Sequence, residues 1–430
     1  MNTGIIKHVT ISKLWGIKTI STDFDEHINI FIGINGSSKT TFLNLIEATF
    51  LVDLKVFYSI DFEHVKIDLI DSSIQSITVM KFEKAGDVFI RYSFDYEEPI
   101  EIPCSEIILQ RPYRLPIIYR EGLNQIKEKM NNIINISWLS VNRDNSDYED
   151  YNRHSSERFS NMVDMKLQEL IKKLLVFHLQ LESDANKDSL KFKEEVLSLM
   201  LYNSKFDNYN ENNLKLFEST DIESMRRDLY KAFNKLGVAK DKSGIIQNHI
   251  NKIQESISRI SNSDRISFED VFVLSLINRT VSIVDISKEH EMNTANIYAP
   301  LTHFWKCLKS FMPNKNFQLN ADNQRDLYIE LLEGSEQKQE IPITSLSSGE
   351  KQLFILLSEA LLQNKTSQVF IADEPELSLH IDWQRKILNA LLDLNPKAQI
   401  IVATHSPEIA GNFPQNIINM KNITIYESFK

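Results

Sequence analysis

The segment GINGSSKT, residues 33–40, decides the fold of this chain. It follows the apolar run INIFI (28–32), which predicts a buried strand, and it precedes residues 39–50, whose apolar positions recur with a helical period. A glycine-rich loop between a strand and a helix is the setting of a phosphate-binding loop, because backbone N–H groups and the positive helix end face phosphate oxygens. The residues expected to bind a nucleotide there are Gly33, Asn35, Gly36, Ser37, Ser38, Lys39, Thr40 and Thr41.

Three positions of this loop carry separate expectations. Lys39 supplies a positive charge to the phosphates, and the Thr40 hydroxyl is expected on Mg²⁺. Ser38 stands where the pattern has glycine. If that position requires a positive φ, a serine there stores roughly 1–2 kcal/mol of strain. Such strain would affect turnover more than nucleotide binding.

A second anion site is expected at LSSGE, residues 346–350, directly before a helix. A serine hydroxyl and backbone N–H groups at a helix N-terminus attract an anion, although the same residues also make an ordinary helix cap. The stretch resembles the signature sequence of ABC ATPases, LSGGQ, with Ser at the third place and Glu at the fifth, and is called the signature segment below. This resemblance implies that Ser347, Ser348 and Gly349 contact the nucleotide.

Two more motifs end predicted strands. VFIADE (369–374) ends in Asp373 and Glu374, at the strand edge where ligands bind in open α/β sheets. Asp373 is expected to hold Mg²⁺, and Glu374 to act as the base that activates the attacking water. IIVATHSPE (400–408) ends a second strand in His405, which is placed to contact a γ-phosphate oxygen.

Together these motifs resemble the ABC ATPase head of the SMC, Rad50 and RecF branch. They are similar above all to prokaryotic stand-alone ATPases that share the signatures DEPELSLH (373–380) and ATHSPE (403–408). The resemblance covers residues 1–50 and 341–411 closely and the region between them loosely. It implies ATP and Mg²⁺ as ligands, and hydrolysis with Glu374 and His405 as catalytic residues.

The resemblance also implies a homodimer or a higher homo-oligomer. In that branch the site forms between two heads, so Ser347 and Gly349 of one chain would cap the γ-phosphate held by Lys39 of the other. Ser378 and His380 match the family's D-loop, which crosses this interface. Gln110 is a candidate for the Q-loop glutamine.

With the resemblance, the remaining patterns predict the fold class: α/β, an ABC ATPase head with a parallel-sheet core plus an antiparallel strand lobe, and a helical insertion that is compatible with a short coiled coil. Residues 74–109 alternate as an antiparallel meander does, and strand–helix alternation after residue 341 predicts a parallel sheet. The domains expected are an N-terminal lobe over 1–143, a helical insertion over 144–312 and a C-terminal lobe over 313–430.

The insertion contains two apolar seams with heptad spacing, over residues 163–181 and 246–260. They are compatible with the two legs of a short antiparallel coiled-coil hairpin, and equally with a plain helical subdomain. Further helices are expected over 268–290 and 299–311.

Composition limits the class of partner. A net charge of −11 disfavours wholesale coating of nucleic acid, although a local basic groove remains possible. Cys104 and Cys307 have no metal-like spacing and suit reduced thiols. No signal peptide and no apolar stretch of membrane-spanning length is found, so we expect a cytoplasmic protein without a membrane partner.

In the family that the chain resembles, the biological role depends on the domains or proteins that are attached to the ATPase head. The insertion has the size seen in ATPase subunits of anti-phage systems, the Septu-type ATPase paired with an HNH nuclease and the PARIS-type ATPase paired with a Toprim effector. The sequence ends at Lys430, so a nuclease is expected on a separate polypeptide. The expected function is a sensor or scaffold that controls such an effector.

Three alternatives remain. One is a DNA-repair ATPase similar to RecF or Rad50, and another is a slowly hydrolysing scaffold, which Ser38 favours. A transporter nucleotide-binding domain is disfavoured, because Leu346 follows Lys39 by 307 positions where such domains have a short spacing.

Overall fold

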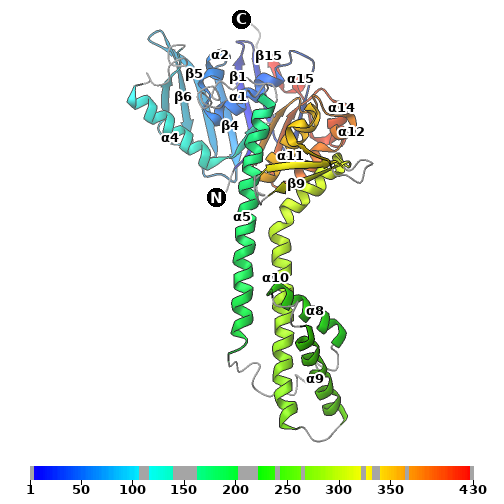
Figure 1. Cartoon of the computed structure of the whole chain (residues 1–430). Coiled ribbons are helices and arrows are strands. Elements are labelled where there is room, and N and C mark those ends of the chain that lie inside the picture. Colours follow the sequence, from blue (N-terminus) through cyan, green and yellow to red (C-terminus); the bar gives the residue numbers. More distant parts are fainter. Residues whose placement is uncertain are drawn as a thin grey trace. The chain divides into compact units, whose positions relative to one another are not determined.

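The computed structural model describes residues 4–105, 116–138, 162–201, 221–237, 243–262, 267–320, 326–331, 339–363 and 368–426. The chain forms two compact units. The head unit comprises Met1–Leu175 with His303–Lys430, and the insertion unit comprises Val176–Thr302. Figure 1 shows the elements of both.

The head unit contains a seven-stranded antiparallel sheet in the order β15-β2-β1-β4-β5-β6-β7. Strands β4 to β7 lie within or next to the expected meander, whereas β2 and β15 were not predicted. The strands are β1 (Ile5–Leu14), β2 (Lys18–Asp23), β4 (His64–Ile70), β5 (Ser76–Lys84), β6 (Asp87–Phe94), β7 (Ile100–Pro103) and β15 (Thr424–Tyr426).

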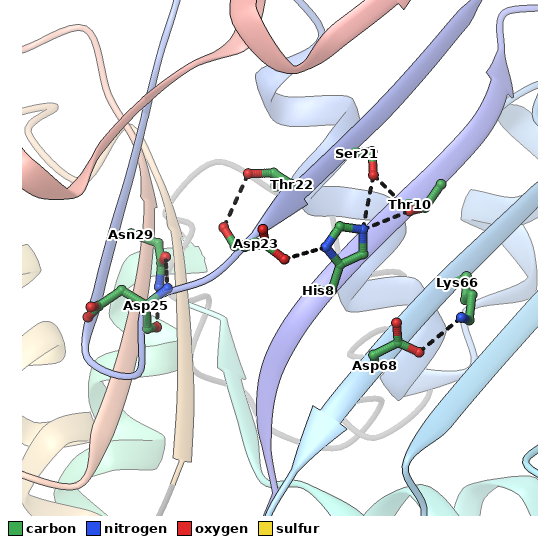
Figure 2. Close-up of polar contacts among 9 residues, drawn as sticks. All are labelled: His8, Thr10, Ser21, Thr22, Asp23, Asp25, Asn29, Lys66 and Asp68. Carbon is green, nitrogen blue, oxygen red and sulfur yellow. Dashed lines mark hydrogen bonds and ion pairs between the residues drawn. The ribbon is translucent and has the colours of Figure 1, made fainter.

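Polar side chains fix the register between β1 and β2, as Figure 2 shows. His8 Nδ1 lies 2.7 Å from Asp23 Oδ1, and His8 Nε2 lies 3.0 Å from Ser21 Oγ. His8 faces Asp23 and Thr10 faces Ser21 across the strand pair. Such cross-strand pairs hold an antiparallel register. The register shifts between Ile11 and Leu14, and beyond this irregularity Lys18 pairs with Leu14 at the end of β1.

A five-stranded parallel sheet has the order β14-β3-β13-β12-β8, with every neighbouring pair parallel. The fold class predicted from the sequence is confirmed by this sheet and by the antiparallel one. Both central strands, β12 and β13, are almost entirely buried, as expected for strands covered on both faces. The five strands are β3 (Ile28–Ile32), β8 (Ile136–Trp138), β12 (Gln368–Asp373), β13 (Ala398–Ala403) and β14 (Ile417–Asn419).

Helix α1 (Lys39–Leu51) joins the core of the two sheets. Its buried residues form one cluster with side chains of β1 and β4 from the antiparallel sheet and of β12 and β13 from the parallel sheet. Gln399 of β13 is fully buried and ties the sheets together: its Oε1 accepts from the Ile6 N–H at 2.8 Å, and its Nε2 donates to the Ile6 carbonyl at 2.7 Å and the Asp25 carbonyl at 2.8 Å. The start of α1, and with it the phosphate loop, is therefore held by a rigid core.

The rest of the head unit is built on helix α11 (Ser348–Leu362). Its Phe354 contacts Phe304 and Phe317, with ring centroids 6.0 and 5.9 Å apart. The other elements of the head are α2 (Leu54–Ser59), α4 (Ile117–Ile133), β9 (Lys315–Asn320), β10 (Asp326–Leu331), β11 (Gln339–Pro342), α12 (Ile381–Gln384), α13 (Ile387–Leu394), α14 (Pro407–Ala410) and α15 (Met420–Ile423).

Four helices belong wholly or partly to the insertion unit: α5 (Met162–Ser198), α8 (Ile222–Lys235), α9 (Ser243–Asn262) and α10 (Phe268–Phe311). Two separate helices had been expected over 268–290 and 299–311, and this was wrong: α10 continues through Pro300. The apolar seam of α9 joins a cluster with α8 and α10. Among the described residues that cluster has no member from α5, so α9 belongs to a packed helical subdomain.

In the part of the chain that the structure describes, no helix combines the length and the apolar character needed to cross a bilayer. The expected loop over 144–160 lies outside the described residues.

Candidate functional site

The phosphate loop connects β3 to α1, as the sequence predicts. Gly36 has φ 79°, a backbone conformation that favours glycine. A Cβ added at Gly33 would lie 2.6 Å from Ser37 Oγ, so the loop leaves no room for a side chain there. Ser37 Oγ is itself buried without a hydrogen-bond partner among the described residues. An unsatisfied buried hydroxyl in a glycine loop fits a site that a polar ligand completes.

Ser38 adopts φ 71° and ψ 22° at the N-cap of α1, so the condition for strain stated above is met. A left-handed conformation costs a serine roughly 1–2 kcal/mol. Its hydroxyl makes no cap hydrogen bond; instead Ser38 Oγ accepts from Lys18 Nζ at 3.3 Å. Sequence patterns did not predict this contact, because it depends on how β2, the strand that carries Lys18, pairs in the sheet.

Lys39 is almost completely buried and its ammonium group is already engaged. Nζ donates to the Gly33 carbonyl at 2.9 Å and lies 2.8 Å from His405 Nε2. With Lys39 charged, His405 accepts through Nε2 and carries its proton on Nδ1. Burial lowers the pKa of Lys39, and the carboxylates of Glu374 and Asp373 oppose that effect.

Two carboxylates stand at the end of β12. Burial raises the pKa of Asp373, while a hydrogen bond from the Thr40 side chain opposes the rise. Asp373 Oδ1 is buried without a partner among the described residues. Glu374 has φ 48°, its N–H donates to the Ala403 carbonyl at 2.8 Å, and its Oε1 lies 3.9 Å from His405 Nε2. The structure thus places Glu374 beside His405, as expected from adjacent strands.

The strand order explains why these residues meet. Strand β13 lies between β3 and β12, so the residues after β13 fall between the phosphate loop and the carboxylates. His405 follows β13 and reaches Lys39 on one side and Glu374 on the other. Residues 366 positions apart in the chain are joined in this way.

Glu376 is a residue that the sequence interpretation quoted without a role. Its Oε1 accepts from the Thr404 hydroxyl at 2.7 Å, the His405 N–H at 2.8 Å and the Ser406 N–H at 3.1 Å. One carboxylate therefore holds the backbone that carries His405. Acidic residues are common after a strand. The one sequence signal for a role of Glu376 was therefore its position two residues after Glu374.

The signature segment begins α11. Ser347 and Glu350 form a reciprocal capping box, with the Ser347 N–H donating to Glu350 Oε2 at 2.9 Å. Burial raises the pKa of Glu350, but hydrogen bonds from Lys315 and Ser347 outweigh burial and lower it. Ser347 and Ser348 are exposed, whereas Gly349 is buried.

Gly349 touches the D-loop of its own chain. A Cβ at this position would lie 2.2 Å from the Ser378 carbonyl oxygen, a distance that no side chain tolerates. Ser378 has φ 70°, and Gln352 Nε2 donates to the Pro375 carbonyl at 3.1 Å. The signature helix and the loop after β12 are therefore fitted to one another.

The donor set fits Mg²⁺ bound with a nucleotide. The Asp373 carboxylate and the Thr40 hydroxyl are hard oxygen ligands, and one carboxylate oxygen lacks a partner. Across the described residues no group of three or more His, Cys, Asp or Glu side chains is arranged as a metal site.

The remaining predicted positions are less informative. Asn35 is exposed near the tip of the loop, beside Ile34, which is 83% exposed. Thr41 is half-buried in the first turn of α1. Gln110 lies outside the described residues.

Comparison with known families gives one match over most of the chain. The AAA_21 family, described as "AAA domain, putative AbiEii toxin, Type IV TA system", matches residues 94–411.

Two curated proteins are similar over shorter stretches. The DNA repair protein RecN of Rickettsia typhi (strain ATCC VR-144 / Wilmington) is 26% identical over 239 residues, 52% of this chain and 40% of that protein. The Retron Vc95 probable ATPase of Vibrio cholerae serotype O1 biovar El Tor is 37% identical over 94 residues, 19% of this chain and 18% of that protein. The chain thus spans less than half the length of either relative.

Solved structures of Smc heads are also similar. The Smc head domain of Pyrococcus furiosus with an extended coiled coil, bound to the C-terminal domain of ScpA, has a TM-score of 0.43 and 13% identity over 100% of this chain and 97% of that chain. The Smc head domain of Pyrococcus yayanosii with a coiled coil and joint has a TM-score of 0.42 and 14% identity over 100% of this chain and 98% of that chain.

Proposed function

Because the chain belongs to the AAA_21 family of ATPase domains, we propose that it binds and hydrolyses ATP at the edge of its parallel sheet. The observation that carries the proposal is the convergence of Lys39, Thr40, Asp373, Glu374 and His405, which come from both ends of the chain.

The phosphate loop provides the binding half of the proposed reaction. Backbone N–H groups at the start of α1 and the Lys39 ammonium bind the phosphates, and the anion replaces Gly33 and His405 as partners of that ammonium. Asp373 and Thr40 would hold Mg²⁺, and the ion would supply positive charge beside the phosphates.

The chemical half belongs to Glu374 and His405. The Glu374 carboxylate orients the attacking water and takes its proton. His405, once released from Lys39, donates a hydrogen bond to the γ-phosphate oxygen that gains charge. Their present separation of 3.9 Å keeps both within reach of one reacting group.

Exposed signature residues support a head-to-head homodimer. Ser347 and Ser348 begin α11 with free side-chain surface, so a second chain's nucleotide can reach this helix end. In this arrangement ATP joins two heads and hydrolysis separates them. Sedimentation of the chain with ATP, with ADP and without nucleotide tests the idea; a monomer under all three conditions would reject it.

Turnover of purified protein tests the ATPase assignment directly. Lys39→Ala should abolish nucleotide binding, and Glu374→Gln should retain binding while turnover falls on the order of 100-fold. Unchanged turnover in Glu374→Gln would remove the base assignment, and normal ATP binding by Lys39→Ala would remove the phosphate-loop assignment.

For the biological role, we propose a cytoplasmic sensor or scaffold of an anti-phage complex that controls a separate effector, an HNH or Toprim nuclease or a toxin. The support is the family description, which names a putative toxin of a toxin–antitoxin system, and the match to a retron ATPase. Phage plating on cells that carry the gene with its neighbours, with wild-type or Glu374→Gln protein, tests this role. Equal plating efficiency with and without the wild-type genes speaks against it.

The match to RecN favours a second candidate, a DNA-repair ATPase. That function predicts ATP turnover stimulated by DNA and reduced survival of a deletion strain after DNA damage. A slowly hydrolysing scaffold is the third candidate, and the positive φ of Ser38 supports it. Single-turnover kinetics separate it from the others, because a scaffold retains bound ATP.

A further inference from the structure

A second lysine lies beside the phosphate loop. Lys18 Nζ donates to Ser38 Oγ at 3.3 Å, and the same ammonium lies 5.8 Å from the centroid of the Tyr426 ring. Lys39 reaches Gly33 and His405 instead. Two ammonium groups from different elements of the head unit therefore contact the loop.

The backbone of Lys18 is fixed on both sides. Strand β2 lies between β15 and β1, with Lys18 opposite Leu14 on β1 and opposite Tyr426 on β15. The side chain is half-buried. The Lys18 side chain therefore reaches Ser38 from a backbone position that is fixed by strand pairing.

The charges around Lys18 favour an anion nearby. The ammonium of Lys18 contacts Ser38 Oγ and the Tyr426 ring, and neither partner carries a negative charge that would neutralise it. The first turn of α1 has no acidic residue. The N-terminus of a helix carries positive partial charge, so a lysine held there is repelled unless a negative ligand is present. Ser37, which precedes Ser38 in the loop, has a buried hydroxyl without a hydrogen-bond partner in the described part of the chain.

We propose that Lys18 is a second phosphate-binding cation of the nucleotide site, and that Ser38 holds its ammonium group beside the loop. The inference rests on the proposed ATP binding and deepens it, since it assigns Lys18 to the polyphosphate chain. It also gives the strained serine a purpose: glycine at position 38 would relieve the strain but would leave Lys18 without its hydrogen-bond partner.

The test compares ATP dissociation constants of full-length variants by calorimetry. Lys18→Met should weaken ATP binding about 10- to 100-fold, the range for losing a hydrogen bond between charged groups. Lys18→Arg keeps the charge and should remain within about threefold of wild type. Lys66→Met is the matched control, because Lys66 lies on the same sheet with an ion pair to Asp68 at 3.3 Å; its ATP affinity should be unchanged. Melting temperatures verify that each variant is folded.

Inorganic tripolyphosphate identifies the part of the nucleotide that Lys18 contacts. If Lys18 binds phosphate, Lys18→Met weakens tripolyphosphate and ATP by the same factor. A loss confined to ATP would overturn the phosphate assignment, since Lys18 would then contact adenosine. Equal ATP affinity of wild type and Lys18→Met, both folded, would also overturn it.

A double-mutant cycle tests the role of Ser38 as a positioning residue. Ser38→Ala should weaken ATP binding in the wild type but leave Lys18→Met unchanged, because the serine acts through the lysine. Equal effects in both backgrounds would overturn that part. A wild-type chain that binds no ATP would instead reject the proposed function, which keeps the two failures distinct.

Discussion

Glu376 holds the backbone of His405. A substitution at Glu376 should therefore impair catalysis by displacing His405, although His405 itself is unchanged. In Glu376→Ala, the Thr404 hydroxyl and the N–H groups of His405 and Ser406 lose their acceptor, at present 2.7, 2.8 and 3.1 Å away. Thr404 is buried, but the hydrogen bond of the His405 N–H is exposed, so we expect the free energy of unfolding to fall by about 2–4 kcal/mol rather than by the full sum for three buried groups.

The larger effect is expected on turnover. A displacement of His405 by about 1 Å costs on the order of 100-fold in kcat. Glu376→Gln keeps an oxygen acceptor at the same place and should recover most of this loss. Steady-state turnover at saturating Mg-ATP measures both variants, and urea unfolding measures their stability.

Two comparisons distinguish positioning from general damage. His405→Ala and Glu376→Ala should not add, because they disable the same group. Glu408→Gln is the matched control: Glu408 lies three residues beyond His405 and accepts from Arg385 Nε at 2.6 Å, without contacting the His405 backbone. Additive losses, or wild-type kcat in Glu376→Ala, would refute the reasoning.

Three other outcomes are expected. Gly349→Ala should lower the free energy of unfolding by about 1–3 kcal/mol and abolish ATP-dependent dimers, whereas Ser348→Ala should stay stable in thermal denaturation; a stable, dimerising Gly349→Ala would contradict the close approach to Ser378. The pKa of Asp373 is raised from its ordinary value of 3.8, so the carboxyl is still partly protonated at a pH somewhat above 3.8. Mg²⁺-dependent ATP affinity should therefore fall as the pH is lowered toward that value. Asp373→Asn should lose this pH dependence of the affinity, and a pH profile identical to that of the wild type would exclude Asp373. By linkage, ionisation of this raised group removes native stability as pH rises through its folded pKa. Gln399→Leu should lower the free energy of unfolding in urea by about 3–5 kcal/mol, because two buried backbone groups and one partly buried carbonyl lose partners; a loss under about 1 kcal/mol would show that water replaces the side chain.

Local patterns were enough to predict the parallel sheet, which the strand pairing confirms, and the family resemblance, which the family match over residues 94–411 confirms. The phosphate loop was predicted in the same way, and its binding role stays a prediction. Each depends on a strand, a loop and a helix that follow one another within a few residues. Strand β12, Gln368–Asp373, lies within one or two residues of the strand predicted to end in VFIADE (369–374), for the same reason. The roles of the individual site residues stay predictions.

Contacts between distant segments could not be predicted in this way. The hydrogen bond between Lys18 and Ser38 depends on the pairing of β2 with β1 and β15, and no sequence period reports that pairing. The prediction of two separate helices in place of α10 was wrong for a related reason. Pro300 disfavours a helix locally, but the buried Leu301, Phe304 and Leu308 that follow it stabilise the helix through packing.

Strand β3, which leads into the phosphate loop, has consequences for how the chain is made. Its sheet neighbours are β13 and β14, which begin at Ala398 and Ile417. After Ile28–Ile32 has been synthesised, the ribosome must therefore complete the whole insertion and reach Ala398 before this strand gains a partner. At about 5–20 residues per second, an apolar segment stays unpaired for tens of seconds. Early chain termination would leave this segment exposed for aggregation or chaperone capture, which makes completion of translation itself a checkpoint for the ATPase.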